Sequence, residues 1–118
     1  MNKIIIHPGN GIDFPKQGDY VKLNLTIYDS HKNKIFDSKL FSEEKSMEIR
    51  YRSPESNVLT LLEDLIGEMS LFEKCLLIVD KSCENCLKES EYIRGLANKT
   101  KEITFEVEVL DINKNSYN

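Results

Sequence analysis

Three cysteines carry the most distinctive chemistry in this chain. Cys83 and Cys86 form a Cys-x-x-Cys pair, and Cys75 precedes them. Thiolates in such pairs bind zinc, but a structural zinc site takes four ligands, usually supplied by two pairs. Besides Cys75, the chain offers only His7 and His31, both distant in the sequence. A metal site is therefore a minor alternative, and we expect the protein to bind no metal.

A thiol redox site is the other chemistry that the Cys83–Cys86 pair suggests. It would need the pair at the start of a helix and a thiol pKa below the usual value. No helical pattern follows the pair, and the carboxylates of Glu84, Glu89 and Glu91 would raise a thiol pKa. Redox catalysis is thus also a minor alternative, and nothing in the sequence calls for a cofactor.

The bulk composition is that of an ordinary globular protein, which we expect to form one domain over residues 1–118. Of its 118 residues, 40% are hydrophobic and 31% are charged, and the formal net charge is −4. An acidic protein lacks the positive field that nucleic acids and anionic membranes require, so we expect neither as a partner. No apolar stretch approaches the ~18 residues of a membrane span. Three cysteines and the lack of a signal-peptide core near the start predict a reducing compartment, the cytoplasm.

Four segments have the pattern of β-strands, which place alternate side chains on opposite faces. They are 20–29, 46–51, 74–80 and 102–112. Segment 102–112 alternates most regularly, with apolar residues at every second position from Ile103 to Val109. Segment 74–80 is apolar on both faces, which is typical of a central strand that is covered on both sides. Its period directs Cys75 toward the core with Leu77 and Val79.

One helix is predicted, from Ser56 or Asn57 as its N-cap to Gly67 as its stop. The apolar residues at helical spacing are Val58, Leu59, Leu62, Leu65 and Ile66. Segment 89–101 holds either a second helical turn or a loop. Because the strands follow one another without the helices of βαβ units, we predict an α+β fold, an antiparallel sheet packed on one short helix.

A series of turn and strand motifs, taken in order, matches a known family. The chain has Pro8-Gly9-Asn10-Gly11, then Pro15-Lys16-Gln17-Gly18-Asp19 before a long strand, then Phe36-Asp37-Ser38 at a strand end. A helix followed by Gly67-Glu68-Met69-Ser70 and a last strand containing "TFEVEVLDI" complete the series. This order resembles the FK506-binding protein (FKBP) domain over about residues 3–112, with a short polar tail at 113–118. The resemblance implies a twisted antiparallel sheet wrapped around one short α-helix.

The resemblance also implies an activity. The founding members of the family are peptidyl-prolyl cis-trans isomerases, which hold a proline ring in an aromatic pocket between helix and sheet. Rotation about the X-Pro bond must break amide resonance, with a barrier of ~18–20 kcal/mol. The twisted amide is less polar than the planar one, so an apolar pocket favours the transition state. This chemistry needs no nucleophile, metal or cofactor.

The residues that match the family's pocket are carried over one by one. Phe36 and Asp37 correspond to the Phe-Asp pair at the pocket wall, and Phe105 corresponds to a deep phenylalanine of the last strand. Val58 and Leu59 correspond to the Val-Ile pair at the helix start, where a backbone N–H binds the substrate carbonyl. Met47 falls near a phenylalanine expected on the strand before the helix.

Three positions depart from the family pattern. Leu62 stands where the tryptophan of the pocket floor is expected, and the chain has no tryptophan. Leu25 stands where a tyrosine is expected, and Ser82–Cys86 replaces a tyrosine-bearing segment. Losing a tryptophan from a packed site costs roughly 3–5 kcal/mol, of which leucine recovers a part. The resemblance therefore implies weak or no isomerase activity and weak or absent FK506 binding.

Two functions stay open at this point. The first is a domain that binds protein or X-Pro peptide partners, as scaffolding in chaperone complexes, like the N-terminal domain of the aryl hydrocarbon receptor-interacting protein that it resembles. The second is a functional isomerase with a repacked pocket. The residues also have structural interpretations: Phe36, Phe105, Leu59 and Leu62 as ordinary core residues, and Asp37 as a turn cap or the partner of a lysine such as Lys39.

Overall fold

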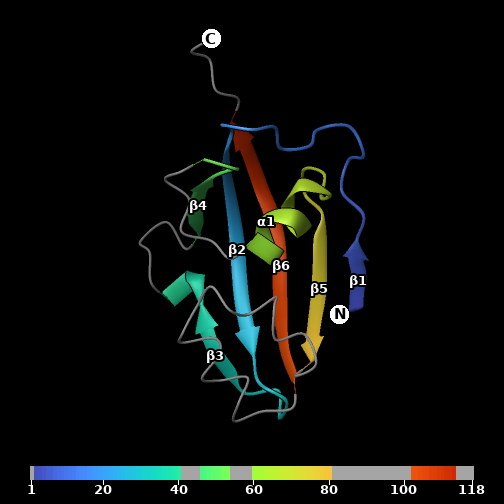
Figure 1. Cartoon of the computed structure of the whole chain (residues 1–118), viewed down its shortest axis with the longest axis vertical. Helices are drawn as coiled ribbons and strands as arrows, with labels where there is room; N and C mark the ends of the chain where they lie inside the picture. Colours follow the sequence, from blue (N-terminus) through green and yellow to red (C-terminus); the bar gives the residue numbers. More distant parts are fainter. Residues whose placement is uncertain (1, 41–45, 54–59, 81–101, 114–118) are drawn as a thin grey trace.

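The computed structural model of the chain describes residues 2–40, 46–53, 60–80 and 102–113 (Figure 1). Within these ranges the chain forms strands, one α-helix and one 3-10 helix. The elements are β1 (Asn2–His7), β2 (Tyr20–Tyr28), β3 (Lys34–Asp37), η1 (Ser38–Leu40), β4 (Met47–Arg50), α1 (Thr60–Gly67), β5 (Lys74–Asp80) and β6 (Glu102–Asn113). No helix in these ranges has the length and apolar character needed to cross a membrane.

All strands join one antiparallel sheet in the order β1-β5-β6-β2-β3, and β4 also pairs with β2. The two short strands divide one edge of β2 between them. β4 pairs with residues 20–23 of β2, and β3 pairs with residues 26–28. Figure 1 shows them following each other along the same side of β2. The sheet therefore has one edge made of two separate strands, with residues 41–45 between them in the sequence.

The two longest strands, β2 and β6, form the centre of the sheet because of their alternating sequences. The buried apolar residues of β2 are Val21, Leu23, Leu25 and Ile27, and those of β6 are Ile103, Phe105, Val107 and Val109. The register sets Leu25 opposite Val107 and Ile27 opposite Phe105. These cross-strand pairs place the apolar sets of both strands on one face, as the period-two pattern predicts. We call this face, which carries α1, the inner face.

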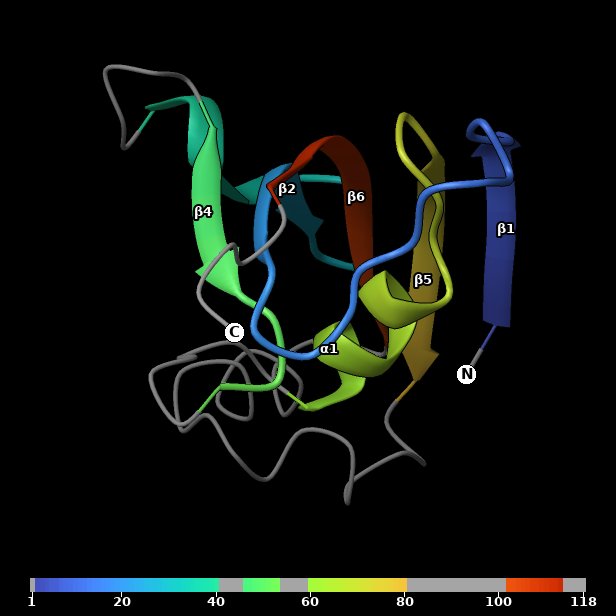
Figure 2. The same cartoon turned by 90° about the horizontal axis from the view of Figure 1, so that it is seen from above.

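Helix α1 covers the inner face of the sheet (Figure 2). Its buried residues are Leu61, Leu62, Leu65 and Ile66. A helix of eight residues is unstable by itself, so burial of this apolar side provides most of its stability. The predicted end at Gly67 is confirmed. The predicted N-cap, Ser56 or Asn57, lies outside the described residues.

The end of β4 is tied to the end of α1 through Tyr51. The ring of Tyr51 is buried, and its hydroxyl accepts a 2.7 Å hydrogen bond from Nε of Arg52. Nη2 of Arg52 also contacts Oδ1 of Asp64 on α1 at 3.1 Å. A Cβ on Gly67 would overlap the Tyr51 hydroxyl, so only glycine allows the ring to lie this close to the helix. These contacts fix the position of α1 relative to β4.

Two elements, β1 and η1, have no signal in the sequence. β1 is the edge strand beside β5, and its isoleucines Ile4, Ile5 and Ile6 are 43%, 54% and 39% exposed. A strand with similar residues on both faces has no period-two signal to detect. β5, in contrast, has the predicted bounds and lies between β1 and β6. Its inner residues are buried, whereas its outer residues are not. The strand was predicted to be covered on both faces, and in the described structure it is covered on one.

Candidate functional site

The structure describes six of the eight predicted site residues. They come from five elements: Leu25 from β2, Phe36 and Asp37 from β3, Met47 from β4, Leu62 from α1 and Phe105 from β6. Val58 and Leu59, the predicted source of a backbone donor, lie outside the described residues. Leu25, Leu62 and Phe105 belong to one apolar core, and Phe36 and Met47 pack against it. Asp37 is not part of this core, because it lies opposite Thr26, whose side chain alternates away from the inner face.

Phe36, Ile27 and Phe105 form one cross-strand row on the inner face. Ile27 of β2 lies between them, opposite Phe36 on one side and Phe105 on the other. Phe105 is fully buried, whereas Phe36 is half-buried and packs against the core. The row therefore runs from the interior of the sheet to an accessible aromatic side chain at its edge.

Leu25 and Leu62, which replace the expected tyrosine and tryptophan, are 6% and 4% exposed. Both belong to the same core as Phe105. Their side chains are packed in this core and carry no group that donates a hydrogen bond. At these two positions the site offers apolar contact only.

Met47 and Phe36 are the half-buried apolar members of the site. Met47 lies opposite Leu23 and Phe36 lies opposite Ile27, four residues further along β2. At the rise of an antiparallel strand, that separation is about 13 Å. A methionine and a phenylalanine thus stand on the two short strands that share one edge of β2. Both side chain types adapt well to apolar ligands.

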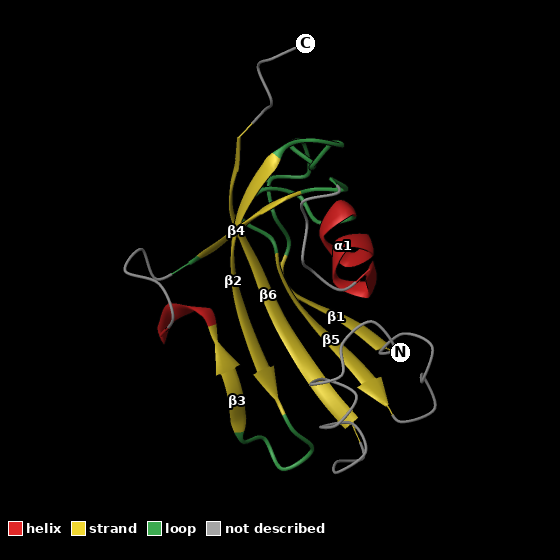
Figure 3. Cartoon of the chain, turned by 60° about the vertical axis from the view of Figure 1, so that its left-hand side comes forward, coloured by secondary structure: helices red, strands yellow, loops and turns green. Residues whose placement is uncertain are grey.

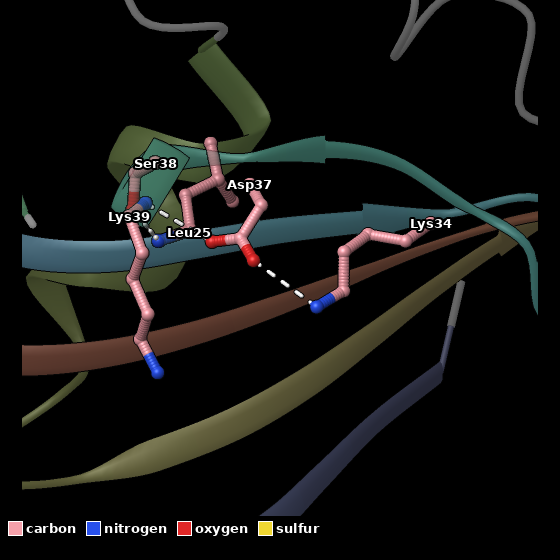
Figure 4. Close-up of polar contacts among 5 residues, drawn as sticks. All are labelled: Leu25, Lys34, Asp37, Ser38 and Lys39. Carbon is pink, nitrogen blue, oxygen red and sulfur yellow. Dashed lines mark hydrogen bonds and ion pairs between the residues drawn. The ribbon is translucent and has the colours of Figure 1, made fainter. Parts of the chain in front are cut away.

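Asp37 ends β3, and its carboxylate contacts two lysines (Figure 4). Oδ1 accepts a 3.0 Å hydrogen bond from the backbone N–H of Lys39, which caps η1, and Oδ2 lies 3.1 Å from Nζ of Lys34. The Lys39 N–H, followed by Lys34, holds the pKa of Asp37 below its ordinary value of 3.8. The same ion pair raises the pKa of Lys34 above 10.5. In this register Asp37 shares a row with Thr26, next to the row of Phe36.

Ser38 is a site residue that the sequence analysis did not predict. Its hydroxyl is buried and accepts a 3.0 Å hydrogen bond from the backbone N–H of Leu25 (Figure 4). This bond joins the start of η1 to β2 beside a predicted pocket residue. Ser38 therefore fixes where β3 leaves the sheet, and with it the position of Phe36 and Asp37. The only sequence signal was its place after the Phe-Asp pair.

Comparison with known proteins gives the family. No family model matches the chain. FK506-binding protein 1B of Aspergillus fumigatus is 32% identical to it over 119 residues, which cover 95% of this chain and 93% of that protein. The chain belongs to the FK506-binding protein family. This result confirms the family that the ordered turn motifs predicted.

Solved structures confirm the FKBP fold. The N-terminal domain of FKBP42 from Arabidopsis thaliana matches with a TM-score of 0.67 at 22% identity, covering 95% of this chain and 85% of that one. FkpA from Escherichia coli matches with a TM-score of 0.65 at 16% identity, covering 94% of this chain. The chain spans 47% of the length of FkpA, so it corresponds to a part of that protein. In general terms, the chain is an FKBP-type domain of the peptidyl-prolyl isomerase class.

The cysteines do not add a second site within the described part of this FKBP domain. Cys75 is fully buried on β5, and its thiol donates to Oε2 of Glu73 at 3.0 Å. Burial, followed by this contact, raises the pKa of Cys75 to about 12, so the thiol stays protonated at neutral pH. No group of three metal-binding side chains occurs among the residues that the structure describes. Cys83 and Cys86 lie outside them.

Proposed function

We propose that this FKBP-type domain binds protein or proline-containing peptide partners and has weak or no isomerase activity. The observation that supports it most directly is the packing of Leu25 and Leu62 in the same core as Phe105. An apolar binding edge remains at Phe36 and Met47, while the positions of the expected tyrosine and tryptophan carry aliphatic side chains. Such a site retains binding contacts and lacks contacts that strengthen in the transition state.

The expected loss of rate follows from the missing groups. A tyrosine hydroxyl in a dry site is a donor worth about 1 kcal/mol or more, and leucine cannot replace it. A tryptophan floor contributes burial and shape, of which leucine recovers a part. A combined penalty of about 3 kcal/mol on the transition state lowers the rate by roughly two decades. The same losses weaken binding of FK506, the ligand after which the fungal relatives are named.

The state of Asp37 supports the same proposal. Both carboxylate oxygens already accept hydrogen bonds, from the Lys39 N–H and from Lys34. An aspartate held in this way shapes the end of β3, and a ligand must compete with Lys34 for it. We therefore assign Asp37 a structural role at the edge of the site, and Phe36 and Met47 the role of partner contacts. Proteins of chaperone assemblies in the cytoplasm are the partner class we propose.

A peptide isomerisation assay tests the proposal. Exchange NMR on a panel of X-Pro peptides, which needs no coupled protease, reports turnover and binding in the same sample. We expect line-shape changes that show binding and little acceleration of cis-trans exchange. Phe36→Ala should weaken binding, and Tyr20→Ala, which removes a more exposed aromatic side chain from β2, serves as the control. Turnover at the level of an ordinary isomerase would refute the proposal.

A working isomerase with a repacked pocket is the second candidate, and the half-buried Phe36 on the row that leads to Phe105 favours it. Leu25 and Leu62 leave more room than tyrosine and tryptophan, which would admit a bulky residue before proline. This candidate predicts a measurable rate on such peptides that falls when Phe36 or Asp37 is replaced by alanine. No acceleration on any member of the X-Pro panel would eliminate it.

A further inference from the structure

Strand β5 has apolar residues on both faces, although only its inner face is covered by other parts of the described structure. Its inner residues Cys75, Leu77 and Val79 are buried under α1 and the core. Its outer residues include Leu76 and Ile78, which are apolar and only half-buried. Antiparallel strands with one face in water normally alternate apolar and polar residues, whereas strands that are apolar on both faces are covered on both. The outer face of β5 therefore has the residues of a buried surface.

The exposed apolar surface extends onto β1. The register sets Ile4 opposite Leu76, so that both side chains belong to the outer face, and Ile4 is 43% exposed. We call Ile4, Leu76 and Ile78 the outer apolar strip. Figure 3 shows α1 on the other face of the sheet. The strip is thus separate from the candidate pocket, which lies on the helix side.

An acidic column on β6 borders the strip. Glu106 lies opposite Leu76, and Thr104 lies opposite Ile78. Glu102 and Glu108 lie further along the same face of β6, Glu102 opposite Asp80 and Glu108 opposite Lys74. Within the described ranges Glu106 forms no salt bridge, although its charge helps to raise the pKa of Lys34, after the larger effect of Asp37. An apolar surface with negative charge along one side is complementary to a segment with an apolar face and a positively charged flank.

We propose that the outer face of β1, β5 and β6 binds a basic amphipathic segment of a partner protein. Its apolar side packs on the outer apolar strip, and a lysine or arginine at its flank lies over Glu106. A second copy of this chain fits less well, because packing two such faces together would bring two acidic columns close. The negative charge also disfavours nucleic acid and anionic lipid as occupants.

A synthetic peptide tests this proposal directly. The probe is a labelled Leu/Lys peptide patterned at helical spacing, and binding is followed by fluorescence anisotropy. Ile4→Thr should weaken binding by about fivefold, the effect of losing one partly buried apolar contact. Ile5→Thr is the matched control, because Ile5 is the next residue of β1 but lies opposite Cys75, on the inner face. It should leave the affinity unchanged.

Charge reversal provides a test that does not alter apolar packing. Glu106→Lys should weaken binding more than Glu48→Lys, which makes the same change on β4, two strands away. A version of the peptide with glutamate in place of lysine should not bind. The proposal is overturned if Ile4→Thr and Ile5→Thr weaken peptide binding equally, or if the acidic peptide binds as well as the basic one. It is also overturned if the amide chemical shifts that change in NMR spectra on adding the basic peptide belong to Phe36 and Met47. Concentration-dependent dimers in sedimentation velocity that Ile4→Thr abolishes would also overturn it, in favour of a second copy.

Discussion

The ring of Tyr51 occupies the space that a side chain on Gly67 would need. A Cβ at Gly67 would stand 2.9 Å from Cζ of Tyr51 and would overlap its hydroxyl. The contact joins the end of α1 to the residue after β4, and Leu62 and Met47 of the candidate site lie on these two elements. The geometry of the site thus depends on a glycine and a tyrosine outside it.

Gly67→Ala should destabilise the protein by about 1–3 kcal/mol, because the added methyl group overpacks a buried aromatic ring. Urea unfolding followed by circular dichroism measures the change. Glu68→Ala, at the exposed next residue, should cost less than about 0.5 kcal/mol. In the double variant Gly67→Ala/Tyr51→Phe, loss of the hydroxyl should relieve part of the clash, so the two effects should not add. Full additivity would contradict the proposed overlap.

Leu25→Tyr should raise the isomerase rate if the missing hydroxyl limits it. A donor of about 1 kcal/mol in the transition state corresponds to roughly a fivefold increase in kcat/KM. Leu25→Phe adds the ring without the hydroxyl and is the matched control, expected to give a smaller increase or none. Equal rates for the two variants would show that the hydroxyl is not the limiting group. Circular dichroism checks that each variant is folded.

The Asp37–Lys34 pair predicts a defined pH dependence of stability. The pKa of Asp37 is lowered from 3.8. The ionised carboxylate therefore stabilises the folded protein above pH 3.8, and this stabilisation is lost as pH falls through the lower, folded-state pKa. The pKa of Lys34 is raised from 10.5, so its contribution is lost as pH rises through the higher, folded-state pKa. Asp37→Asn should therefore lower the free energy of unfolding at neutral pH, and this loss should become progressively smaller as the pH falls below 3.8. Thermal melts across this range measure it, and the same deficit at every pH would contradict the prediction.

Cys75 should be unreactive until the protein unfolds. The thiol is buried and its pKa is raised to about 12, so little thiolate forms at pH 8. In a Cys83→Ser/Cys86→Ser variant, Cys75 is the remaining cysteine. Ellman's reagent should not label this variant in buffer and should label one thiol in urea. Rapid labelling of the folded protein would show that the thiol is accessible.

The sequence predicted those elements whose burial is one-sided. β2 and β6 have one buried face each, so alternation located them, and Gly67 marked the end of α1. β1 escaped detection because its three isoleucines are exposed on both faces of an edge strand. The resemblance to FKBP motifs predicted that Phe36 and Phe105 both line the pocket, and the register places them in one cross-strand row with Ile27 of β2 between them. It could not predict the Lys34 contact to Asp37 or the Ser38 bond to Leu25, because both depend on the exact path of the turn and η1.

The pairing of β2 with β6 also determines when the fold can form during synthesis. Tyr20 lies opposite Asn113, so the two central strands come from nearly opposite ends of the described chain. Loop closure over such a separation is slow, and the sheet has no centre until β6 is available. While the polypeptide emerges from the ribosome, the apolar face of β2 stays unpaired until β6 has been synthesised. Among the described strands, the one translated last is thus the one that completes the core.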